Sequence, residues 1–478
     1  MLFNSLQFLI FFPVVTGIYF LLPHRFRWIH LLLASCIFYC AFIPVYILIL
    51  IFTIVIDYFA GILIEGGTGK NKKAFLTASI IANVGVLAFF KYYNFFIENV
   101  DALFQSFNMP LDIPLLSIIL PVGLSFHTFQ AMSYTIEIYR GNQKAERHFG
   151  IYALYVMFYP QLVAGPIERP QNLLHQFKEP HSFSSDNLLS GLRLMLWGFF
   201  KKVVIADRLA MYVDTVYDDP GNYHYLNLII ATLFYSIQIY CDFSGYSDIA
   251  IGAARTMGFN LMTNFNRPYF ATNIREFWNR WHISLSTWFR DYVYVPLGGN
   301  RSGIAKMYFN LTVVFLLSGL WHGANWTFII WGSLHVVYFC FYTIAKVKLK
   351  FNLPKSLVLN FISAAFTFSL VSFAWIFFRA QNTTDALIIV EHIFSRFSEV
   401  EFQPVVFNAA QITRFGITSI SISVFIIALM LLAESKFSPR MDDIHSKPLT
   451  DLAFCSLSLS LIILFGVFQK ASFIYFQF

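Results

Sequence analysis

Two histidines stand among aromatic residues in a way that suits proton transfer. His322 lies in the run 318–326, which places an imidazole between small residues and indoles inside an apolar stretch. Ionisable side chains within a membrane are rare and usually functional, and an imidazole, with an unperturbed pKa of about 6.5, suits general-base catalysis. A structural histidine bonded to a neighbouring helix explains the same pattern. Both interpretations stay open on the residues alone.

His282 lies in a second aromatic segment, 278–292. If this segment is one helix, positions 278, 281, 282, 285 and 288 form one aromatic face. An interfacial amphipathic helix with an aromatic belt is the alternative to a catalytic role. Neither His282 nor His322 has a Cys or His three or four residues further on, so the spacing predicts no metal site.

Asp242 and Asp248 interrupt an apolar run at a spacing of six. On a helix this spacing turns the two carboxylates about 120° apart, too far to act as a paired acid and base unless the helix breaks at Gly245. We predict ion pairs with Arg255 or with a basic residue of 264–300. A proton or cation relay is the alternative.

The chain ends in an aromatic tail, 469–478, that contains Tyr475. Aromatic anchoring at the level of the lipid headgroups accounts for this composition. A phenol on a chain end could also enter a cavity and act as a nucleophile, provided that a base takes its proton.

The elements that carry these residues are predicted to be membrane helices. Of the 478 residues, 57% are hydrophobic and 12% charged, whereas about a quarter of the residues of a soluble protein are charged. Roughly eleven or twelve apolar runs are long enough to cross the hydrocarbon core. They lie near 7–22, 29–47, 47–64, 74–97, 114–136, 188–213, 226–255, 308–321, 325–345, 356–378, 414–434 and 450–468. The predicted fold is an all-α, polytopic helical bundle that forms a single membrane domain over residues 1–478.

Two segments are not simple spans. Residues 150–187 are apolar but interrupted by Pro160, Pro166 and Pro170, which break or bend helices. Residues 264–300 are rich in charge, which is costly at the centre of a bilayer. We predict that both segments are re-entrant or interfacial.

The net charge of +7 does not indicate nucleic-acid binding, because the basic residues sit in short loops between apolar runs. These loops are predicted to be cytoplasmic, which places the tail after residue 468 on the outer side. Run 7–22 is predicted to be a retained first span, because it lacks a basic flank and a cleavage site. The five cysteines lie in apolar runs and are predicted to be packing residues.

The motifs around His322, at 242–248, at 278–292 and at 160–170 together resemble the membrane-bound O-acyltransferase (MBOAT) family. The resemblance covers essentially the whole chain. It is to the bacterial branch that contains the membrane subunits of alginate, peptidoglycan and cellulose O-acetyltransferases, with teichoic-acid D-alanyltransferase as a more distant relative. It implies a cytoplasmic thioester donor, a bundle with a central funnel and two characteristic histidines.

Carried over by motif, the resemblance makes His322 the catalytic histidine and places His282 in the donor-side passage. The tail resembles an aromatic motif that in the D-alanylation system lies on a small separate peptide whose tyrosine accepts the acyl group. Tyr475 is therefore the candidate relay residue. The residues that bind the donor are not indicated.

The function expected from this resemblance is transfer of acetyl groups from cytoplasmic acetyl-CoA across the bacterial cytoplasmic (inner) membrane. The final acceptor would be an extracytoplasmic polysaccharide such as alginate, reached through an SGNH-type partner. No metal and no nucleic acid are expected, and membrane lipids surround the chain. D-alanyl or other acyl transfer to a cell-wall polymer is one alternative. A secondary transporter is another, although we find no convincing internal repeat.

Overall fold

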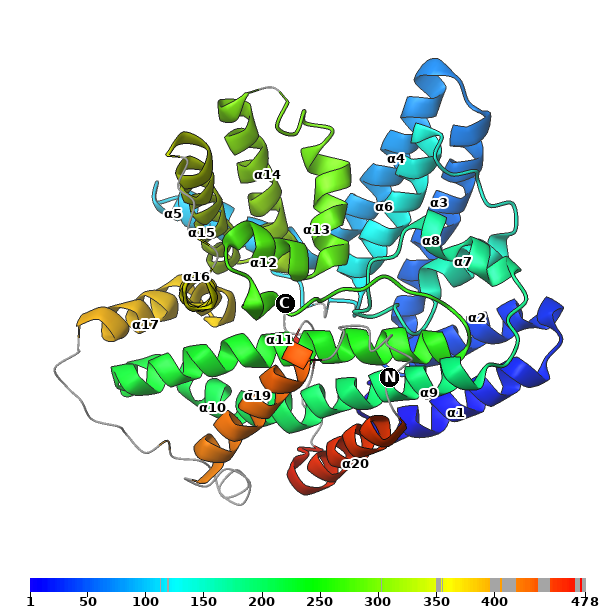
Figure 1. Cartoon of the computed structure of the whole chain (residues 1–478). Coiled ribbons are helices and arrows are strands. Elements are labelled where there is room, and N and C mark those ends of the chain that lie inside the picture. Colours follow the sequence, from blue (N-terminus) through cyan, green and yellow to red (C-terminus); the bar gives the residue numbers. More distant parts are fainter. Residues whose placement is uncertain are drawn as a thin grey trace. The chain divides into compact units, whose positions relative to one another are not determined.

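A computed structural model describes the chain except for residues 112, 118–119, 302, 350–353, 355, 396–404, 406–417, 437–447, 469–472 and 475–478. Every regular element in the described residues is a helix, so the all-α prediction is confirmed (Figure 1). Membrane interiors favour this outcome, because a helix satisfies its own backbone hydrogen bonds without water.

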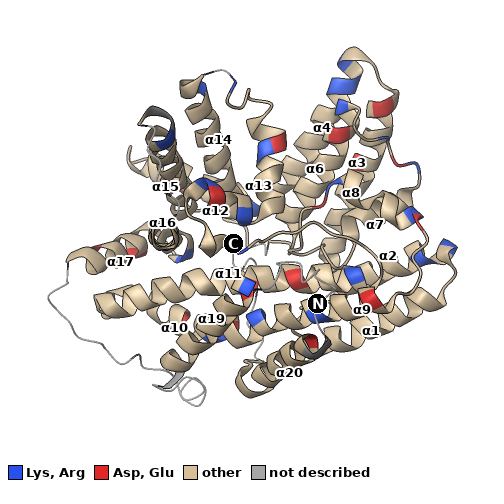
Figure 2. Ribbon diagram, in the orientation of Figure 1, with Lys and Arg blue, Asp and Glu red and all other residues tan. Residues whose placement is uncertain are grey.

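In the part of the chain that the structure describes, six helical stretches are long and apolar enough to cross a membrane, and two shorter apolar helices accompany them, at Leu6–Leu21 and Thr450–Phe465. The six are Pro44–Gly66, Gly69–Gln105, Tyr225–Thr256, Ile304–His322, Trp326–Lys346 and Leu357–Arg379. Charged residues are sparse along these helices (Figure 2). The chain is therefore a multi-pass membrane protein.

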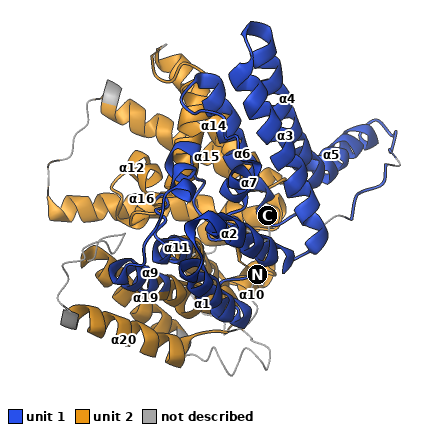
Figure 3. Ribbon diagram, turned by 90° about the vertical axis from the view of Figure 1, so that its right-hand side faces the viewer, with its two compact units in different colours: residues 1–195, 249–262 blue, residues 196–248, 263–478 orange. Residues whose placement is uncertain are grey.

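Two compact units make up the described chain (Figure 3). Unit 1 consists of residues 1–195 and 249–262, and unit 2 of residues 196–248 and 263–478. Each is described by itself, and the single membrane domain predicted over 1–478 stays a prediction.

Unit 1 contains the N-terminal helices. They are α1 (Leu6–Leu21), α2 (His24–Cys40), η1 (Pro44–Tyr46), α3 (Ile47–Gly66), α4 (Gly69–Leu87), η2 (Ala88–Tyr92), α5 (Tyr93–Gln105), α6 (Leu124–Arg140), α7 (Phe149–Met157), α8 (Pro170–Leu173), η3 (His175–Lys178) and the start of α9 (Ser185–Phe199). Helices α3, α4 and α6 pack around buried polar groups. The Asp57 carboxylate accepts hydrogen bonds from Ser79 at 2.6 Å and from Asn83 at 2.8 Å, and the hydroxyl oxygens of Ser79 and Thr135 lie 3.1 Å apart.

Within the run predicted as a span over 114–136, the described helix, α6, begins at Leu124. Pro121 has no amide hydrogen to donate to a preceding helical turn. Gly123, at φ +77°, then turns the chain into α6, and a Cβ there would lie 2.9 Å from the carbonyl oxygen of Leu162. A left-handed conformation at such a crowded position requires glycine.

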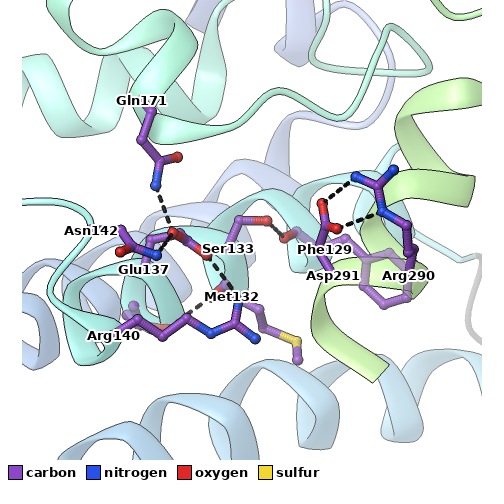
Figure 4. Close-up of polar contacts among 10 residues, drawn as sticks. Phe129, Met132, Ser133, Glu137, Arg140, Asn142, Gln171, Arg290 and Asp291 are labelled. Carbon is purple, nitrogen blue, oxygen red and sulfur yellow. Dashed lines mark hydrogen bonds and ion pairs between the residues drawn. The ribbon is translucent and has the colours of Figure 1, made fainter. Parts of the chain in front are cut away.

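Short helices broken at prolines make up residues 150–187, as the sequence predicted; their position relative to a membrane stays a prediction. Tyr155 donates to the carbonyl oxygen of Glu168 at 3.0 Å, and the Glu168 carboxylate accepts from Asn172 at 2.6 Å. Also in unit 1, the Glu137 carboxylate accepts hydrogen bonds from Arg140 at 3.1 Å, from Asn142 at 2.9 Å and from Gln171 at 2.7 Å (Figure 4).

Unit 2 contains the remaining helices. They are the end of α9, η4 (Phe200–Ala206), α10 (Asp207–Tyr217), η5 (Pro220–Asn222), α11 (Tyr225–Thr256, of which residues up to 248 belong here), η6 (Pro268–Phe270), α12 (Ile274–Arg280), α13 (Ile283–Phe289), η7 (Arg290–Tyr294), α14 (Ile304–His322), α15 (Trp326–Thr343), η8 (Ile344–Lys348), α16 (Leu357–Arg379), α17 (Thr383–Ser395), α19 (Thr418–Lys436) and α20 (Pro448–Phe465). In the η7 turn, Arg290 pairs with Asp291 at 2.7 Å (Figure 4).

Helices α14 and α15 approach each other at two glycines. A Cβ on Gly332 would lie 2.5 Å from the carbonyl oxygen of Phe315, and a Cβ on Gly319 would clash with that of Phe328. Small residues at a helix crossing let two membrane helices come into backbone contact. This contact fixes the two helices that carry His322 and its neighbours.

Candidate active site

His282 lies at a break between two short helices. A single continuous helix over 278–292, one possibility raised by the sequence, does not form: α12 ends at Arg280 and α13 begins at Ile283. His282 has φ +42° and ψ +55°, a left-handed conformation that costs a non-glycine residue about 1–3 kcal/mol. The backbone amide of Ile283 donates to the carbonyl oxygen of Asn264 at 2.8 Å, which holds the break in place. Such a conformation persists only where its surroundings impose it, and it is typical of functional sites.

The Asn264 side chain orients the His282 ring. Its oxygen Oδ1 accepts from Ser284 Oγ at 2.9 Å and lies 3.0 Å from His282 Nδ1, while its nitrogen donates to Ser247 at 3.1 Å. A carbonyl oxygen only accepts hydrogen bonds, so Nδ1 carries the proton and Nε2 holds the lone pair. His282 is fully buried, and burial lowers its pKa well below the ordinary value. The ring is therefore neutral near pH 7, with its lone pair on Nε2.

His322 is the last residue of α14, and only 3% of it is exposed. Three aromatic rings surround its imidazole: Trp321 at 4.9 Å, Phe378 at 5.0 Å and Trp331 at 5.1 Å between centroids. Trp331 comes from α15 and Phe378 from α16, so three helices of unit 2 build this cage. The imidazole is thus held in one place and largely removed from water, as a group that transfers protons in a membrane needs.

A continuous series of rings joins the two predicted histidines to a third, His335, which the sequence analysis missed. Trp321 lies 6.0 Å from His282 and 4.9 Å from His322. On the other side of His322, Trp331 lies 4.9 Å from His335. His335 occurs in an apolar run just as His322 does, so the same reasoning about intramembrane ionisable residues would have found it.

Trp278 fixes the tautomer of His335. Its indole Nε1 donates to His335 Nδ1 at 3.3 Å, and an indole nitrogen can only donate. The neutral His335 therefore carries its proton on Nε2. Within the part of the chain that the structure describes, this Nε2 has no hydrogen-bond partner, and neither has the indole nitrogen of Trp331 or of Trp375.

These three N–H donors belong to one buried cluster. Trp331 and Trp375 stack at 5.8 Å, and all three side chains are at most 1% exposed. A buried donor without an acceptor costs about 1–3 kcal/mol. These donors lie beside His322 and lack an acceptor among the described residues. They are therefore suited to donate hydrogen bonds to the oxygen atoms of a ligand that binds transiently.

Asp242 and Asp248 form ion pairs with two neighbouring lysines. Lys202 lies 2.7 Å from Asp242 and 2.8 Å from Asp207, and Lys201 lies 2.5 Å from Asp248. Helix α11 continues through Gly245, so the carboxylates stay on separate faces and do not form an acid–base pair. The predicted partners were Arg255 or a basic residue of 264–300, not these lysines, although two adjacent lysines in the apolar run 188–213 were a visible signal.

Part of the predicted C-terminal tail is buried in unit 2. Tyr475 itself lies outside the described residues, but Phe473 and Ile474 are described and are 1% and 3% exposed. The ring of Phe473 lies 4.8 Å from Tyr246 and 5.9 Å from Phe243. Phe243 in turn contacts His282 edge to face at 4.6 Å. The tail thus leads to the series of rings that contains both predicted histidines.

Comparisons with known proteins identify the family of the chain. Residues 148–380, which include all three histidines, match the model of the membrane-bound O-acyltransferase family, MBOAT. The chain is 38% identical over 439 residues to the probable alginate O-acetylase AlgI of Pseudomonas aeruginosa, covering 91% of this chain and 81% of that protein.

Two further relatives carry related names. The peptidoglycan O-acetyltransferase of Helicobacter pylori is 38% identical over 427 residues, covering 82% of this chain and 79% of the relative. The teichoic acid D-alanyltransferase of Bacillus subtilis is 29% identical over 277 residues, covering 54% and 69%. The more similar relatives are thus named for acetyl transfer and the more distant one for D-alanyl transfer.

Proposed function

Since the chain belongs to the membrane-bound O-acyltransferase family, and is therefore an acyltransferase, we propose that it transfers acetyl groups from cytoplasmic acetyl-CoA toward an extracytoplasmic polysaccharide. The relatives that are 38% identical are named as an alginate O-acetylase and a peptidoglycan O-acetyltransferase. The observation that carries the proposal is the buried cage around His322, with His282 and His335 joined to it through indole rings.

His322 is the general base in this scheme. It takes the proton of the acceptor hydroxyl while the oxygen attacks the thioester carbonyl. The new C–O bond forms, the C–S bond breaks, and the proton passes to the leaving sulfur to give free CoA. Burial of the imidazole keeps water away from the thioester, which suppresses hydrolysis.

The thioester oxygen gains negative charge as the tetrahedral intermediate forms, and it needs hydrogen-bond donors. Trp331, Trp375 and His335 supply buried N–H groups that lack acceptors among the described residues. We assign these donors to the carbonyl oxygen of the acetyl group. No metal is needed for this step.

Tyr475 is the proposed first acceptor. It directly follows Ile474, which is buried in the unit that carries His322. Its phenol would attack the thioester, and the resulting acetyl-tyrosine would pass its acetyl group outward. This route spares the charged CoA moiety from crossing hydrocarbon, where charges are costly.

An extracytoplasmic partner of the SGNH type completes the scheme, because its serine can carry the acetyl group from Tyr475 to a sugar hydroxyl. The protein would then reside in the bacterial cytoplasmic (inner) membrane, with the donor on one side and the polymer on the other. His282 lines the donor-side passage in this proposal.

A pair of variants tests the base. Purified His322→Ala should insert at normal abundance yet form no acetylated product from labelled acetyl-CoA. His392→Ala is a suitable control, because His392 is also buried in unit 2 and its hydrogen bond among the described residues goes to the Tyr223 carbonyl oxygen, at 3.2 Å. Activity retained in His322→Ala would defeat the assignment.

Two further measurements test the relay and the donor. Tyr475→Phe should stop polysaccharide acetylation in cells, and full acetylation would remove Tyr475 from the scheme. Supplying acetyl-CoA and a D-alanyl carrier-protein thioester side by side distinguishes acetyl from D-alanyl transfer, which the 29% identical relative makes the second candidate.

A further inference from the structure

Backbone hydrogen bonds hold the C-terminal arm, residues 466–478, at both ends of its described part. At the near end, Val467 donates its amide to the carbonyl oxygen of Val203 at 2.8 Å, and Arg208 donates to the carbonyl oxygen of Phe465, the last residue of α20, at 2.9 Å. At the far end, the amide of Ile474 donates to Asp242 Oδ2 at 2.8 Å. The arm is thus attached to η4 and α11, and the end of α20 that precedes it is attached to α10.

The two carboxylate oxygens of Asp242 have different partners, one in the arm and one in η4. Oδ2 accepts from Ile474, and Oδ1 pairs with Lys202 at 2.7 Å. Lys202 is itself held by Asp207 at 2.8 Å. A charge-assisted hydrogen bond of this kind is about twice as strong as a neutral one. The carboxylate is therefore a fixed and strong acceptor for a backbone amide that would otherwise be buried without a partner.

Asp248 offers a matched comparison on the same helix. It pairs with Lys201 at 2.5 Å, just as Asp242 pairs with Lys202. The described hydrogen bond to the arm, however, goes to Asp242. Of the two Asp–Lys pairs, the Asp242 pair is therefore the one with a described hydrogen bond to the arm.

We infer that Asp242, held by Lys202, is the positioning residue for the C-terminal arm and fixes it beside the histidine-containing rings. The inference rests on the proposed function, because the arm matters for chemistry only if Tyr475 receives the acetyl group. Asp242 binds the arm through its backbone, which leaves the side chains of the arm free for their own contacts. Phe473 packs on Phe243, and Phe243 contacts His282.

The test measures arm position directly, through a cysteine placed at position 473 of the full-length protein. Phe473 is 1% exposed, so a thiol there should react slowly with N-ethylmaleimide while the arm is docked. Peptide mass spectrometry locates the label at this position, so the native cysteines can stay. Asp242→Asn should raise the labelling rate about tenfold, because the amide replaces one carboxylate oxygen by an NH2 donor, so that either Lys202 or Ile474 loses its acceptor.

Asp248→Asn is the control for a disturbed ion pair and should leave the labelling rate within about twofold of the parent, since it removes no described contact to the arm.

A second pair of variants changes a residue of the arm itself and leaves the buried charged residues unchanged. Ile474→Pro removes the amide donor, whereas Ile474→Ala keeps it. The proline should speed labelling at position 473 and the alanine should not. These variants remain informative if Asp242→Asn fails to accumulate.

Acetyl-tyrosine formation is measured in the same four variants. Loss of acetylation together with fast labelling, in Asp242→Asn and Ile474→Pro alone, supports the positioning role. Equal labelling rates in all variants would overturn it, whatever the acetylation. If instead labelling follows the expected pattern while Tyr475→Phe acetylates polysaccharide normally, the arm is docked as inferred and the relay proposal is the part that fails.

Discussion

Asn264 holds His282 in one tautomer. Because the amide nitrogen of Asn264 is used by Ser247, its oxygen faces the imidazole, at 3.0 Å from Nδ1. His282 therefore donates from Nδ1 and presents the lone pair of Nε2. The side chain that sets this arrangement lies 18 residues away in the sequence, in a segment that also bonds the backbone at the break between α12 and α13.

Replacing this partner by a carboxylate should change the pH dependence of catalysis. Burial holds the pKa of His282 well below its usual range, so the wild-type ring is neutral across pH 6 to 8. In Asn264→Asp, a negative charge at hydrogen-bond distance favours the imidazolium form and raises this pKa. Acetyl transfer should then fall as the pH drops through the raised pKa, in a range where the wild type is still active.

The pH–rate profile of Asn264→Asp with acetyl-CoA is the measurement, and Asn266→Asp is the control, because its position lies close by in sequence but is not bonded to the ring. Parallel profiles for wild type and Asn264→Asp would show that His282 does not titrate in the catalytic range or does not take part in the reaction.

Trp331→Phe should slow acetyl transfer by more than loss of ring area explains. The phenyl ring preserves most of the packing against His322 but removes the indole N–H assigned to the acetyl oxygen. Removing one donor from an oxyanion site typically lowers kcat by about 10²–10³-fold. Trp197→Phe, in α9 of the same unit and stacked on Phe200, controls for a lost indole and should keep kcat within about threefold. A KM effect alone in Trp331→Phe would contradict the assignment.

Glu168 should make stability depend on pH between about 4.5 and 7. Burial, partly offset by hydrogen bonds from Met262 and Asn172, raises the pKa of this carboxyl from 4.5 to about 7. The folded state therefore binds the proton more tightly than the unfolded state. Its contribution to stability is fully present below pH 4.5 and is lost as the pH rises through 7, a change on the order of 3 kcal/mol.

Glu168→Gln cannot ionise, so this part of the pH dependence should disappear. Thermal unfolding in detergent at pH 5 and pH 7.5 measures it: the difference in Tm between the two pH values should be smaller in the variant than in the wild type. Glu179→Gln, an exposed carboxylate in the same loop region, should leave the difference unchanged. An unchanged pH dependence in Glu168→Gln would mean that Glu168 is already ionised in the folded protein.

Local sequence patterns predicted the helical class and singled out His282 and His322 as candidate site residues, because apolar runs and histidines within them are visible in short windows. The start of α6 was also signalled locally, by Pro121 and Gly123, although the predicted run 114–136 passed over both. The same reasoning that selected His322 extends to His335.

Other features depend on contacts between distant residues. A positive φ at His282 has no signature in the sequence, because nothing in its neighbours requires it; the bond from Ile283 to Asn264 does. The pairing of Asp242 with Lys202 and with Ile474 joins residues 40 and 232 positions apart. Residue spacing along one helix could show that the two aspartates do not contact each other, but it could not show which residues they pair with. The orientation of the loops and the central funnel stay predictions.

The glycine contact between α14 and α15 gives a test of how far the cage around His322 depends on packing. Gly332→Ala places a Cβ 2.5 Å from the carbonyl oxygen of Phe315, which is backbone and cannot move aside alone. The two helices must then separate, and Trp331 and His335 flank the altered position on α15. Overpacking of this kind costs about 1–3 kcal/mol, so both Tm and acetyl transfer should fall.

Gly85→Ala in α4 is the matched control, since a Cβ there meets nothing within 4 Å. Alanine is favoured over glycine within a helix by about 0.5–1 kcal/mol, so Gly85→Ala should raise the Tm slightly and leave acetyl transfer unchanged. The same substitution should thus lower the Tm at position 332 and raise it at position 85. This difference distinguishes the effect of a close backbone contact from that of helix propensity. If Gly332→Ala also raised the Tm and kept full activity, α14 and α15 would not touch as described, and the position of His322 against Trp331 would lose its structural basis.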